Sequence, residues 1–251
     1  MDRLIYTALT GMNAAMNRQR MVANNLANAS TPGFRQEVFA VTPTTVRPDG
    51  PSNAVEARAL PRGSVRGADM VAAKVNSTGQ PLDIAVEGKA LIAFQGPGGG
   101  EVYSRRGDLR VSATGLLENG EGLPVLGESG APISVPAGFR VSVAQDGSLL
   151  ANDPAAPNEA AAVIDRIKLV SPEGSVLAKG IDSFLKVPNG GVLAPDPNAR
   201  VLSGALEQSN VRTAETLVDM IDAQRAFEQR AKIIQTAGEL DEAGSRLLGM
   251  T

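Results

Sequence analysis

The stretch "NNLANASTPGF", residues 24–34, ends a helical segment and sets the organisation of the chain. Pro32 disfavours the α conformation of the residue before it, and Gly33 is a poor helix former, so a helix stops here. Asn28 tolerates the left-handed conformation and can bond nearby backbone at the helix end. Upstream, apolar residues recur at three-to-four-residue spacing, at Ile5, Leu9, Met12, Met16, Ala23 and Leu26. The sequence therefore predicts a helix over residues 2–29.

A second helical segment is predicted over residues 210–249. Its stripe comprises Leu217, Ile221, Gln224, Ala231 and Ile234, with Met220 and Phe227 alongside. Ser209 and Asn210 are favourable N-cap residues just before it. Typical globular helices run 8–20 residues, so the length of this segment indicates a coiled coil or bundle.

The region between the predicted helices differs from them in composition and in the spacing of its apolar residues. Most of the 27 glycines and 16 prolines lie here and separate short apolar runs. "LDIAV" alternates, which places Leu82, Ile84 and Val86 on one face of a strand. Turn sequences such as "GPGGG", "ENGEG" and "QDGS" separate further runs at intervals typical of an all-β domain. Residues 36–80 have weak periodicity and are predicted to be an extended connector.

These segments predict an α+β protein. Two long terminal helices, in residues 1–35 and 205–251, are expected to pack as a coiled-coil-like core with a mainly β domain, residues 81–204, inserted between them. As a hypothesis, Leu26, Leu217, Ile221, Phe227 and Ile234 form the contact between the helices or its immediate neighbours. Each helix is long enough to keep a second face, and other copies or related chains are the expected partners of that face.

The composition excludes several classes of function. Among the 251 residues there is no Cys and no His, which rules out thiol catalysis, disulfides, serine–histidine triads and imidazole metal sites. A net charge of −3 provides no excess of positive charge that would attract nucleic acid. Aromatic residues make up only 3% of the chain, which disfavours a carbohydrate-binding module. We expect no cofactor, no small-molecule substrate and no transmembrane segment.

Two local patterns have a chemical alternative. The carboxylates of Glu215, Asp219 and Asp222 could form a general acid–base pair, but a solvated helix face is the simpler interpretation. "QGPGGGE", residues 95–101, lacks the Lys and Ser/Thr of a phosphate-binding loop and is interpreted as a hairpin turn. We therefore expect that the protein is not an enzyme. The N-terminus also lacks the apolar core of a secretory signal, so we expect no cleavable signal peptide.

The two terminal segments resemble bacterial flagellar rod and hook proteins. The family string "A-N-N-(L/I)-A-N-x-x-T-x-G-(F/Y)" is matched at residues 23–34, and "GALEQSNVRTAETLVDMIDAQRAFEQ", residues 204–229, is similar to the C-terminal pattern. "GQPLDIAVEG", "YSRRGDL" and "VAQDGSL" are similar to β-domain motifs of the family. One departure is "KALIAF" after Glu87-Gly88, where the family usually has a glycine and two aromatics. The start "MDRLIYTALTGM" resembles proximal rod proteins more than distal rod or hook proteins.

The resemblance implies a structural subunit of the flagellar basal-body rod, in its proximal part, with a distal rod or hook-type subunit as the alternative. Such proteins are exported by the flagellar type III system and assemble in the periplasm into the driveshaft that carries torque from rotor to hook. The expected partners are other copies, other rod proteins and the export apparatus.

Residues at both ends of the chain are expected to form the subunit contacts. We expect the amides of Asn24 and Asn25 to bond between neighbouring subunits and fix their register, as a buried asparagine does in a coiled coil. The full set of expected interface residues is Met12, Met16, Asn24, Asn25, Leu26, Asn28, Gly33, Phe34, Asn210, Leu217, Met220, Ile221, Gln224, Arg225, Phe227 and Ile234.

Overall fold

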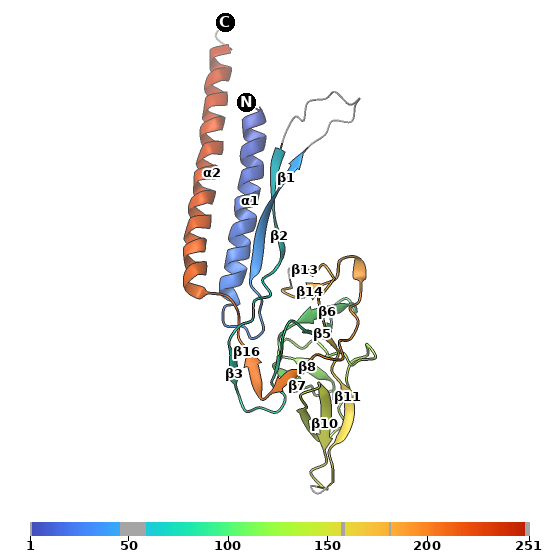
Figure 1. Ribbon diagram of the computed structural model, residues 1–251. Helices are drawn as coiled ribbons and strands as arrows, with labels where there is room; N and C mark the ends of the chain where they lie inside the picture. Colours follow the sequence, from blue (N-terminus) through green and yellow to red (C-terminus); the bar gives the residue numbers. More distant parts are fainter. Residues whose placement is uncertain (1, 46–58, 157–158, 181, 249–251) are drawn as a thin grey trace, which may run out of the picture. The chain divides into compact units, whose positions relative to one another are not determined.

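The computed structural model describes residues 2–45, 59–156, 159–180 and 182–248. The chain forms two compact units (Figure 1). The helical unit comprises residues 1–27, 37–66 and 212–251, and the β unit comprises residues 28–36 and 67–211. A helix at each end of a mainly β region confirms the α+β class, whereas coiled-coil packing of the helices stays a prediction.

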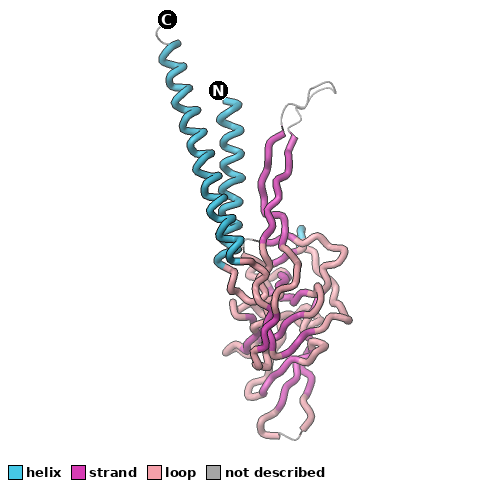
Figure 2. Tube along the Cα trace, turned by 60° about the vertical axis from the view of Figure 1, so that its left-hand side comes forward, coloured by secondary structure: helices cyan, strands magenta, loops and turns pink. Residues whose placement is uncertain are grey.

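Two helices dominate the helical unit. Helix α1 covers Asp2–Ala27 and helix α2 covers Thr213–Leu248, and they lie side by side (Figures 1 and 2). At 1.5 Å per residue, the 26 residues of α1 span about 39 Å and the 36 residues of α2 about 54 Å. No helix in the described part of the chain is both long and apolar enough to cross a membrane.

Helix α2 begins later than predicted. The Thr216 N–H donates to the Arg212 carbonyl at 2.9 Å, which makes Arg212 the residue at the helix cap. Ser209 Oγ instead accepts from the Val211 N–H at 3.2 Å, and the Asn210 amide binds elsewhere. The expectation that Ser209 or Asn210 caps this helix is therefore wrong, because both side chains are used in the preceding loop.

Small side chains line the contact between the two helices. Ala15 on α1 and Ala223 on α2 are buried, at 5% and 1% exposure. A Cβ added to Gly11 would lie 3.3 Å from Arg230 Nε, so the glycine leaves room for this long side chain. At the edge of the contact, Arg18 Nη2 and Asp219 Oδ1 are 3.4 Å apart. The small residues allow the helix backbones to approach closely.

Three strands lie in the segment expected to be an extended connector. Strands β1 (Glu37–Thr45) and β2 (Ala59–Ala68) form a two-stranded sheet, and β3 (Val75–Ser77) pairs with β16. "EVFAVTPTT" is rich in β-branched residues, which favour an extended backbone. The part of the connector at residues 46–58 lies outside the described residues.

The β unit consists of short antiparallel strands. Its largest sheet has the order β12-β5-β6-β14-β13, a second has the order β11-β10-β9, and β15-β4, β16-β3 and β7-β8 form pairs. The strand bounds are β4 Ile84–Val86, β5 Leu91–Gln95, β6 Glu101–Ser104, β7 Leu109–Val111, β8 Leu117–Asn119, β9 Arg140–Val143, β10 Ser148–Asn152, β11 Ala162–Arg166, β12 Leu169–Val170, β13 Ala178–Lys179, β14 Leu185–Lys186, β15 Val201–Ser203 and β16 Ala205–Glu207, with a 3₁₀ turn η1 at Pro188–Gly190.

The β unit has two apolar clusters, and the larger one forms its main core. Ile84, Ile92, Phe94 and Leu149 are fully buried within it. The predicted one-sided strand "LDIAV" is an exception to its pattern, because Ile84, Ala85 and Val86 are all buried and both faces of β4 are covered. The hairpin turn predicted at residues 95–101 is confirmed, since it joins β5 to β6.

Candidate functional site

The asparagine pair near the end of α1 binds the first residue of β1. Asn25 Nδ2 donates to the Glu37 carbonyl at 3.1 Å, and its Oδ1 accepts from the Glu37 N–H at 2.8 Å. Asn24 Nδ2 donates to Glu37 Oε1 at 2.7 Å. Asn25 is 1% exposed, and its amide joins helix to strand within one chain, so the predicted bond to a neighbouring subunit stays a prediction.

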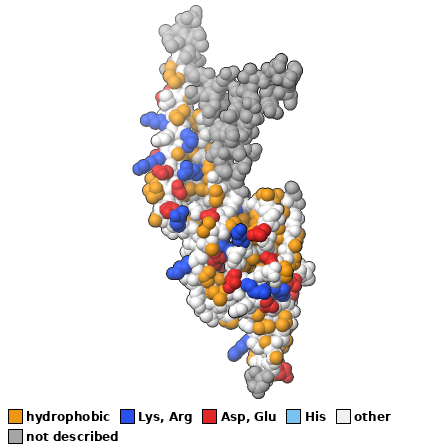
Figure 3. Space-filling model, in the orientation of Figure 1, with side chains coloured by type: hydrophobic (Ala, Val, Ile, Leu, Met, Phe, Trp, Pro, Cys, Tyr) orange, Lys and Arg blue, Asp and Glu red, His pale blue; other side chains and the backbone are white. Residues whose placement is uncertain are grey.

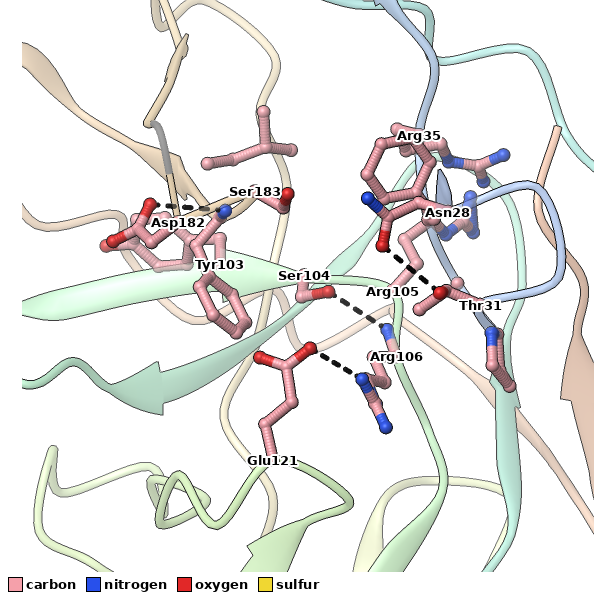
Figure 4. Close-up of a pocket in the computed structure, with 15 residues that line it drawn as sticks. Asn28, Thr31, Arg35, Tyr103, Ser104, Arg105, Arg106, Glu121, Asp182 and Ser183 are labelled. Atoms are coloured by element: carbon pink, nitrogen blue, oxygen red, sulfur yellow. Dashed lines mark hydrogen bonds and ion pairs between the residues drawn. The ribbon is translucent and has the colours of Figure 1, made fainter. Parts of the chain in front are cut away.

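The turn after α1 belongs to the β unit and is closed by its own polar groups. Thr31 Oγ1 donates to Asn28 Oδ1 at 3.1 Å (Figure 4), and the Phe34 N–H donates to the Thr31 carbonyl at 3.3 Å. Gly33 has φ +68°, and a Cβ there would lie 2.3 Å from the Arg105 carbonyl carbon. Both the backbone conformation and the close approach require glycine at this position.

A buried cluster of charges anchors the turn. Arg35 Nη2 donates to Glu207 Oε1 at 2.7 Å, and Arg105 Nε lies 3.1 Å from Glu207 Oε2. The three side chains are at most 3% exposed. Arg35 also donates to the Val71 carbonyl at 2.6 Å, and Glu207 Oε1 accepts from the Ala73 N–H at 2.8 Å. The Glu207 carboxylate thus pairs with both arginines and also binds the backbone at Ala73.

Burial and the neighbouring charges act in opposite directions on Arg105. Loss of solvent lowers its pKa and the Glu207 carboxylate raises it, while Arg35 lowers it further. The Arg105 guanidinium also donates to the Val86 and Gly88 carbonyls, each at 2.7 Å. These acceptors compensate the buried cation, and they tie the cluster to the end of β4.

Asn210 joins the same segments from the other side. Its Oδ1 accepts from the Gln36 N–H at 2.6 Å, and its Nδ2 donates to the carbonyls of Asp69 at 2.9 Å and Val71 at 3.2 Å. We call the three joined segments, residues 28–36, 69–73 and 207–210, the clasp. All of its contacts lie inside the β unit.

Phe34 is held in the clasp by a cation. Lys179 Nζ lies 3.5 Å from the centroid of the Phe34 ring and donates a hydrogen bond to the Arg35 carbonyl. Phe34 itself is 5% exposed. A cation over an aromatic face is attractive, and more so when it is partly desolvated. The turn is therefore fixed on β13 as well.

A small cavity of about 70 Å³ lies beside the turn, lined by residues of the turn, of β6 and of the 182–185 loop (Figure 4). Its carboxylates are already paired, Glu121 with Arg106 at 2.6 Å and Asp182 with Lys186. At its edge, burial raises the pKa of Tyr103 to about 12, so this phenol stays protonated at neutral pH. Among the described residues, no group of three or more acidic side chains is placed to hold a metal ion. The cavity is small and its charged side chains already pair with one another, as expected where segments of the chain pack together.

The outer face of α2 carries exposed apolar side chains. Leu217 is 47% exposed, Ile221 52% and Leu240 58%. Figure 3 shows hydrophobic side chains intermixed with charged ones on the visible face of the helical unit. Leu217 and Ile221 therefore do not form the contact between α1 and α2, which was one of their hypothesised roles. Thr216, the residue before Leu217, and Ala223, two residues after Ile221, are instead buried, at 2% and 1% exposure.

The residues expected at subunit contacts fall into three groups. Those that are buried are Asn25, Gly33 and Phe34; those that are partly buried are Met12, Met16, Asn24, Leu26, Asn28, Asn210, Met220, Phe227 and Ile234; those that are exposed are Leu217, Ile221, Gln224 and Arg225. Gly33, Phe34 and Asn210 come together in the clasp. Sequence reasoning missed Arg35, Glu207 and Arg105, although a charged residue beside each terminal motif was a signal.

The fold and this site define a class of protein. The two ends of the chain are helices, most of the segment between them forms a β unit with its own apolar core, and a buried polar site in that unit links the turn after α1 to the segment before α2. Three family models match the two ends and the middle of the chain. They are "Flagella basal body rod protein" at residues 5–35, "Flagellar hook protein FlgE/F/G D1 domain" at residues 85–151, and "Flagellar basal body rod FlgEFG protein C-terminal" at residues 202–247.

Relatives match over the full length. The chain is 39% identical to the flagellar basal-body rod protein FlgF of Salmonella typhimurium and 38% identical to that of Escherichia coli, with 100% of both chains covered in each case. It is 26% identical to the flagellar basal-body rod protein FlgG of Bacillus subtilis, over 96% of this chain and 97% of that one. The chain belongs to the flagellar basal-body rod protein family.

Proposed function

We propose that this protein is a structural subunit of the proximal part of the bacterial flagellar basal-body rod, the driveshaft that transmits torque from rotor to hook. The observation that carries the proposal is the outer face of α2, where Leu217, Val218 and Ile221 are 47%, 59% and 52% exposed. A helix that has already buried one face and still exposes a second apolar face fits a subunit that packs into an assembly.

The proposed partners of this face are other copies of the chain and other rod proteins. Four of the residues predicted for subunit contacts, Leu217, Ile221, Gln224 and Arg225, are exposed on α2 and available to a neighbour. Coiled-coil-like packing of the long helices, near the axis of a tube, would resist twisting through broad apolar contacts. In this proposal the terminal helices, residues 1–35 and 205–251, form the inner layer, the β domain at residues 81–204 forms an outer one, and residues 36–80 connect them.

The compartment is part of the same proposal. We infer export by the flagellar type III system and assembly in the periplasm, with the export apparatus as a transient partner. A chain with no cysteine suits passage in an unfolded state into an oxidising compartment, because it cannot form disulfides on the way. No catalysed reaction is proposed, since the charged groups of the joint are paired with one another.

The proximal position is favoured over a distal one by the relatives. The identity to FlgF proteins exceeds that to the FlgG protein at similar coverage. A distal rod subunit is the second candidate. Electron microscopy of basal bodies from a deletion strain separates the two, since a proximal subunit leaves a shorter rod stub than a distal one.

The interface is tested by Leu217→Ala combined with Ile221→Ala. If a neighbour buries these side chains, each truncation costs about 2–5 kcal/mol at the contact. Cells that carry the double variant should be non-motile and have incomplete rods, while the purified chain keeps a folded β unit. The matched control is Val163→Ala with Val176→Ala, because these valines of the β unit are 64% and 78% exposed. Intact rods and full motility in the α2 variant would overturn the proposal.

A further inference from the structure

The segment that follows β14 runs over the main sheet of the β unit as irregular chain. We call residues 187–196 the strap; apart from the short 3₁₀ turn η1 it contains no helix or strand. Among the strap side chains that the structure describes, only Leu193 is buried, at 6% exposure, whereas Val192 beside it is 62% exposed. The strap therefore contributes a single apolar side chain to the interior of the unit.

Leu193 belongs to the smaller of the two apolar clusters, which lies on the second face of the main sheet. Successive side chains of a strand point to opposite faces. In β5, Ile92 and Phe94 accordingly enter the main core, while Leu91 and Ala93 enter the smaller cluster. The buried members of the smaller cluster are Leu91, Ala93, Tyr103, Leu126, Val170, Leu185 and Leu193. The sheet thus has an apolar second face, and the strap is part of its cover.

Two hydrogen bonds from the strap backbone attach it to the sheet. The Leu193 N–H donates to Tyr103 Oη on β6 at 2.8 Å, and the Asp196 N–H donates to the Leu169 carbonyl on β12 at 2.8 Å. Both donors lie between residues 193 and 196. Gly190, in the earlier part of the strap, has φ +75°, a conformation that only glycine adopts easily, so it can serve as a hinge.

The phenol that accepts from Leu193 is itself oriented by a buried ion pair. Tyr103 Oη donates its proton to Glu101 Oε2 at 2.8 Å, and Lys168 Nζ donates to Glu101 Oε1 at 2.6 Å. The side chains of Lys168 and Glu101 are 5% and 12% accessible. A hydroxyl has one proton and two lone pairs, so a phenol whose proton points to Glu101 presents a lone pair to the Leu193 N–H.

We propose that the strap is a lid on the smaller apolar cluster, that Tyr103 is its latch, and that it opens as one unit while the main core stays folded. Segments with few buried apolar contacts open at a lower free energy than the whole fold, and the strap has one buried side chain. A groove of about 370 Å³, lined in part by Met70, Leu177 and Leu185, already reaches this cluster. Opening of the strap adds to the apolar surface that the cluster shows to solvent.

The inference does not depend on the rod proposal, and hydrogen exchange of the isolated full-length chain tests it. Tyr103→Phe keeps the ring and removes the acceptor of the Leu193 N–H. Exchange at Leu193 should become about tenfold faster. Exchange at Asp196 should accelerate by the same factor, although its own bond to Leu169 is untouched, because the two amides open together. The Ala93 amide of β5, which donates to the Lys168 carbonyl at 3.0 Å, should keep its rate.

The matched control for this experiment is Ser148→Ala. It removes the bond from Ser148 Oγ to Asp146 Oδ2 at 2.8 Å, outside the smaller cluster, and should leave exchange in the strap unchanged. Acceleration at Leu193 alone, or equal acceleration at Leu193 and Ala93, would overturn the inference.

Thiol labelling decides the case without the Tyr103 variant, should that variant not fold. Val170 is 0% exposed in the smaller cluster and forms a bridge with Pro195 of the strap, whereas Val102 is 2% exposed in the main core. Because the chain has no cysteine, Val170→Cys and Val102→Cys each carry a single thiol. Without denaturant, iodoacetamide should modify the Val170→Cys variant faster than the Val102→Cys variant. Equal rates would show that the cluster opens only with the whole unit, and would overturn the inference.

Discussion

The β unit and the helical unit differ in how completely they bury their apolar side chains. In the β unit Ile92, Phe94 and Leu117 are fully buried in one core, so the unit satisfies its apolar residues by itself. In the helical unit Leu217 and Ile221 remain about half exposed although α2 already packs on α1. The difference fits the proposal that the β unit is complete as a single chain and that the helical unit is completed by assembly. Five experiments test this contrast, in order of decreasing effect.

The largest effect is expected from Phe94→Ala in the core of the β unit. Phe94 is 0% exposed, and removal of a buried phenylalanine ring costs about 3–5 kcal/mol. Urea unfolding followed by near-ultraviolet circular dichroism measures this loss. Phe139→Ala is the control, because Phe139 is 38% exposed and should lose far less. Equal losses at both positions would contradict a self-contained core.

A somewhat smaller loss, about 3 kcal/mol, is expected from Glu207→Gln. The variant leaves the cations of Arg35 and Arg105 buried without their shared carboxylate. Glu173→Gln removes an exposed partner of Lys89 and should change stability by less than about 0.5 kcal/mol. If the two variants unfold at the same urea concentration, the buried cluster does not stabilise the β unit.

Asn25→Ala should cost about 1–3 kcal/mol, and the loss should be local to the helical unit. The variant leaves the buried N–H and carbonyl of Glu37 without their side-chain partner. Hydrogen exchange of the Glu37 amide should accelerate while the amides of β5 keep their protection. Asn13→Ala, at an exposed position of the same helix, is the control. Unchanged exchange at Glu37 would contradict the helix–strand joint.

Alkaline pH should weaken the β unit through one buried phenol. Burial raises the pKa of Tyr103 from 10.0 to about 12, so from about pH 10 to pH 12 the unfolded chain loses this proton while the folded chain keeps it. Stability should therefore fall across this window, and the Tyr103→Phe variant should fall less steeply. Absorbance titration of the folded protein checks the pKa directly: ionisation of Tyr103 near pH 10 would refute the prediction.

The smallest effect on the isolated chain is expected from Leu217→Ser with Ile221→Ser. Exposed substitutions change stability by less than about 0.5 kcal/mol, although the same residues are proposed to matter for rod assembly. Ala223→Leu provides the contrast, because Ala223 is 1% exposed and a larger side chain would push α1 and α2 apart. Thermal unfolding of the helices distinguishes the two. A large loss from the serine variant would mean that these residues pack within the chain.

Sequence patterns located the features that depend on neighbours in the chain. The hairpin of β5 and β6 was predictable because glycine-rich turn chemistry is local. The face of α2 that meets α1 was not, because two apolar stripes on one helix give no sign of which partner each will find. The cluster of Arg35 and Glu207 was out of reach for a different reason: the bond joins residues 172 positions apart, and only the folded topology brings them together.

The pair of asparagines shows a third limit. The sequence places the amides of Asn24 and Asn25 inside the first helix, but it does not reveal that the strand beginning at Glu37 returns to them. An amide can imitate the backbone and pair with both groups of one residue. Its partner can therefore be any residue that tertiary structure supplies.

Burial of the Arg35–Glu207–Arg105 cluster has a consequence for ionic strength. Mobile ions screen exposed pairs such as Arg18–Asp219, whose side chains are 46% and 48% accessible, within a Debye length of about 8 Å in physiological salt. They cannot reach charges that are at most 3% accessible. The attachment of the N-terminal turn should thus keep its strength when a bacterium moves from fresh water to brine, while the charged surface of the helices responds to the salt around it.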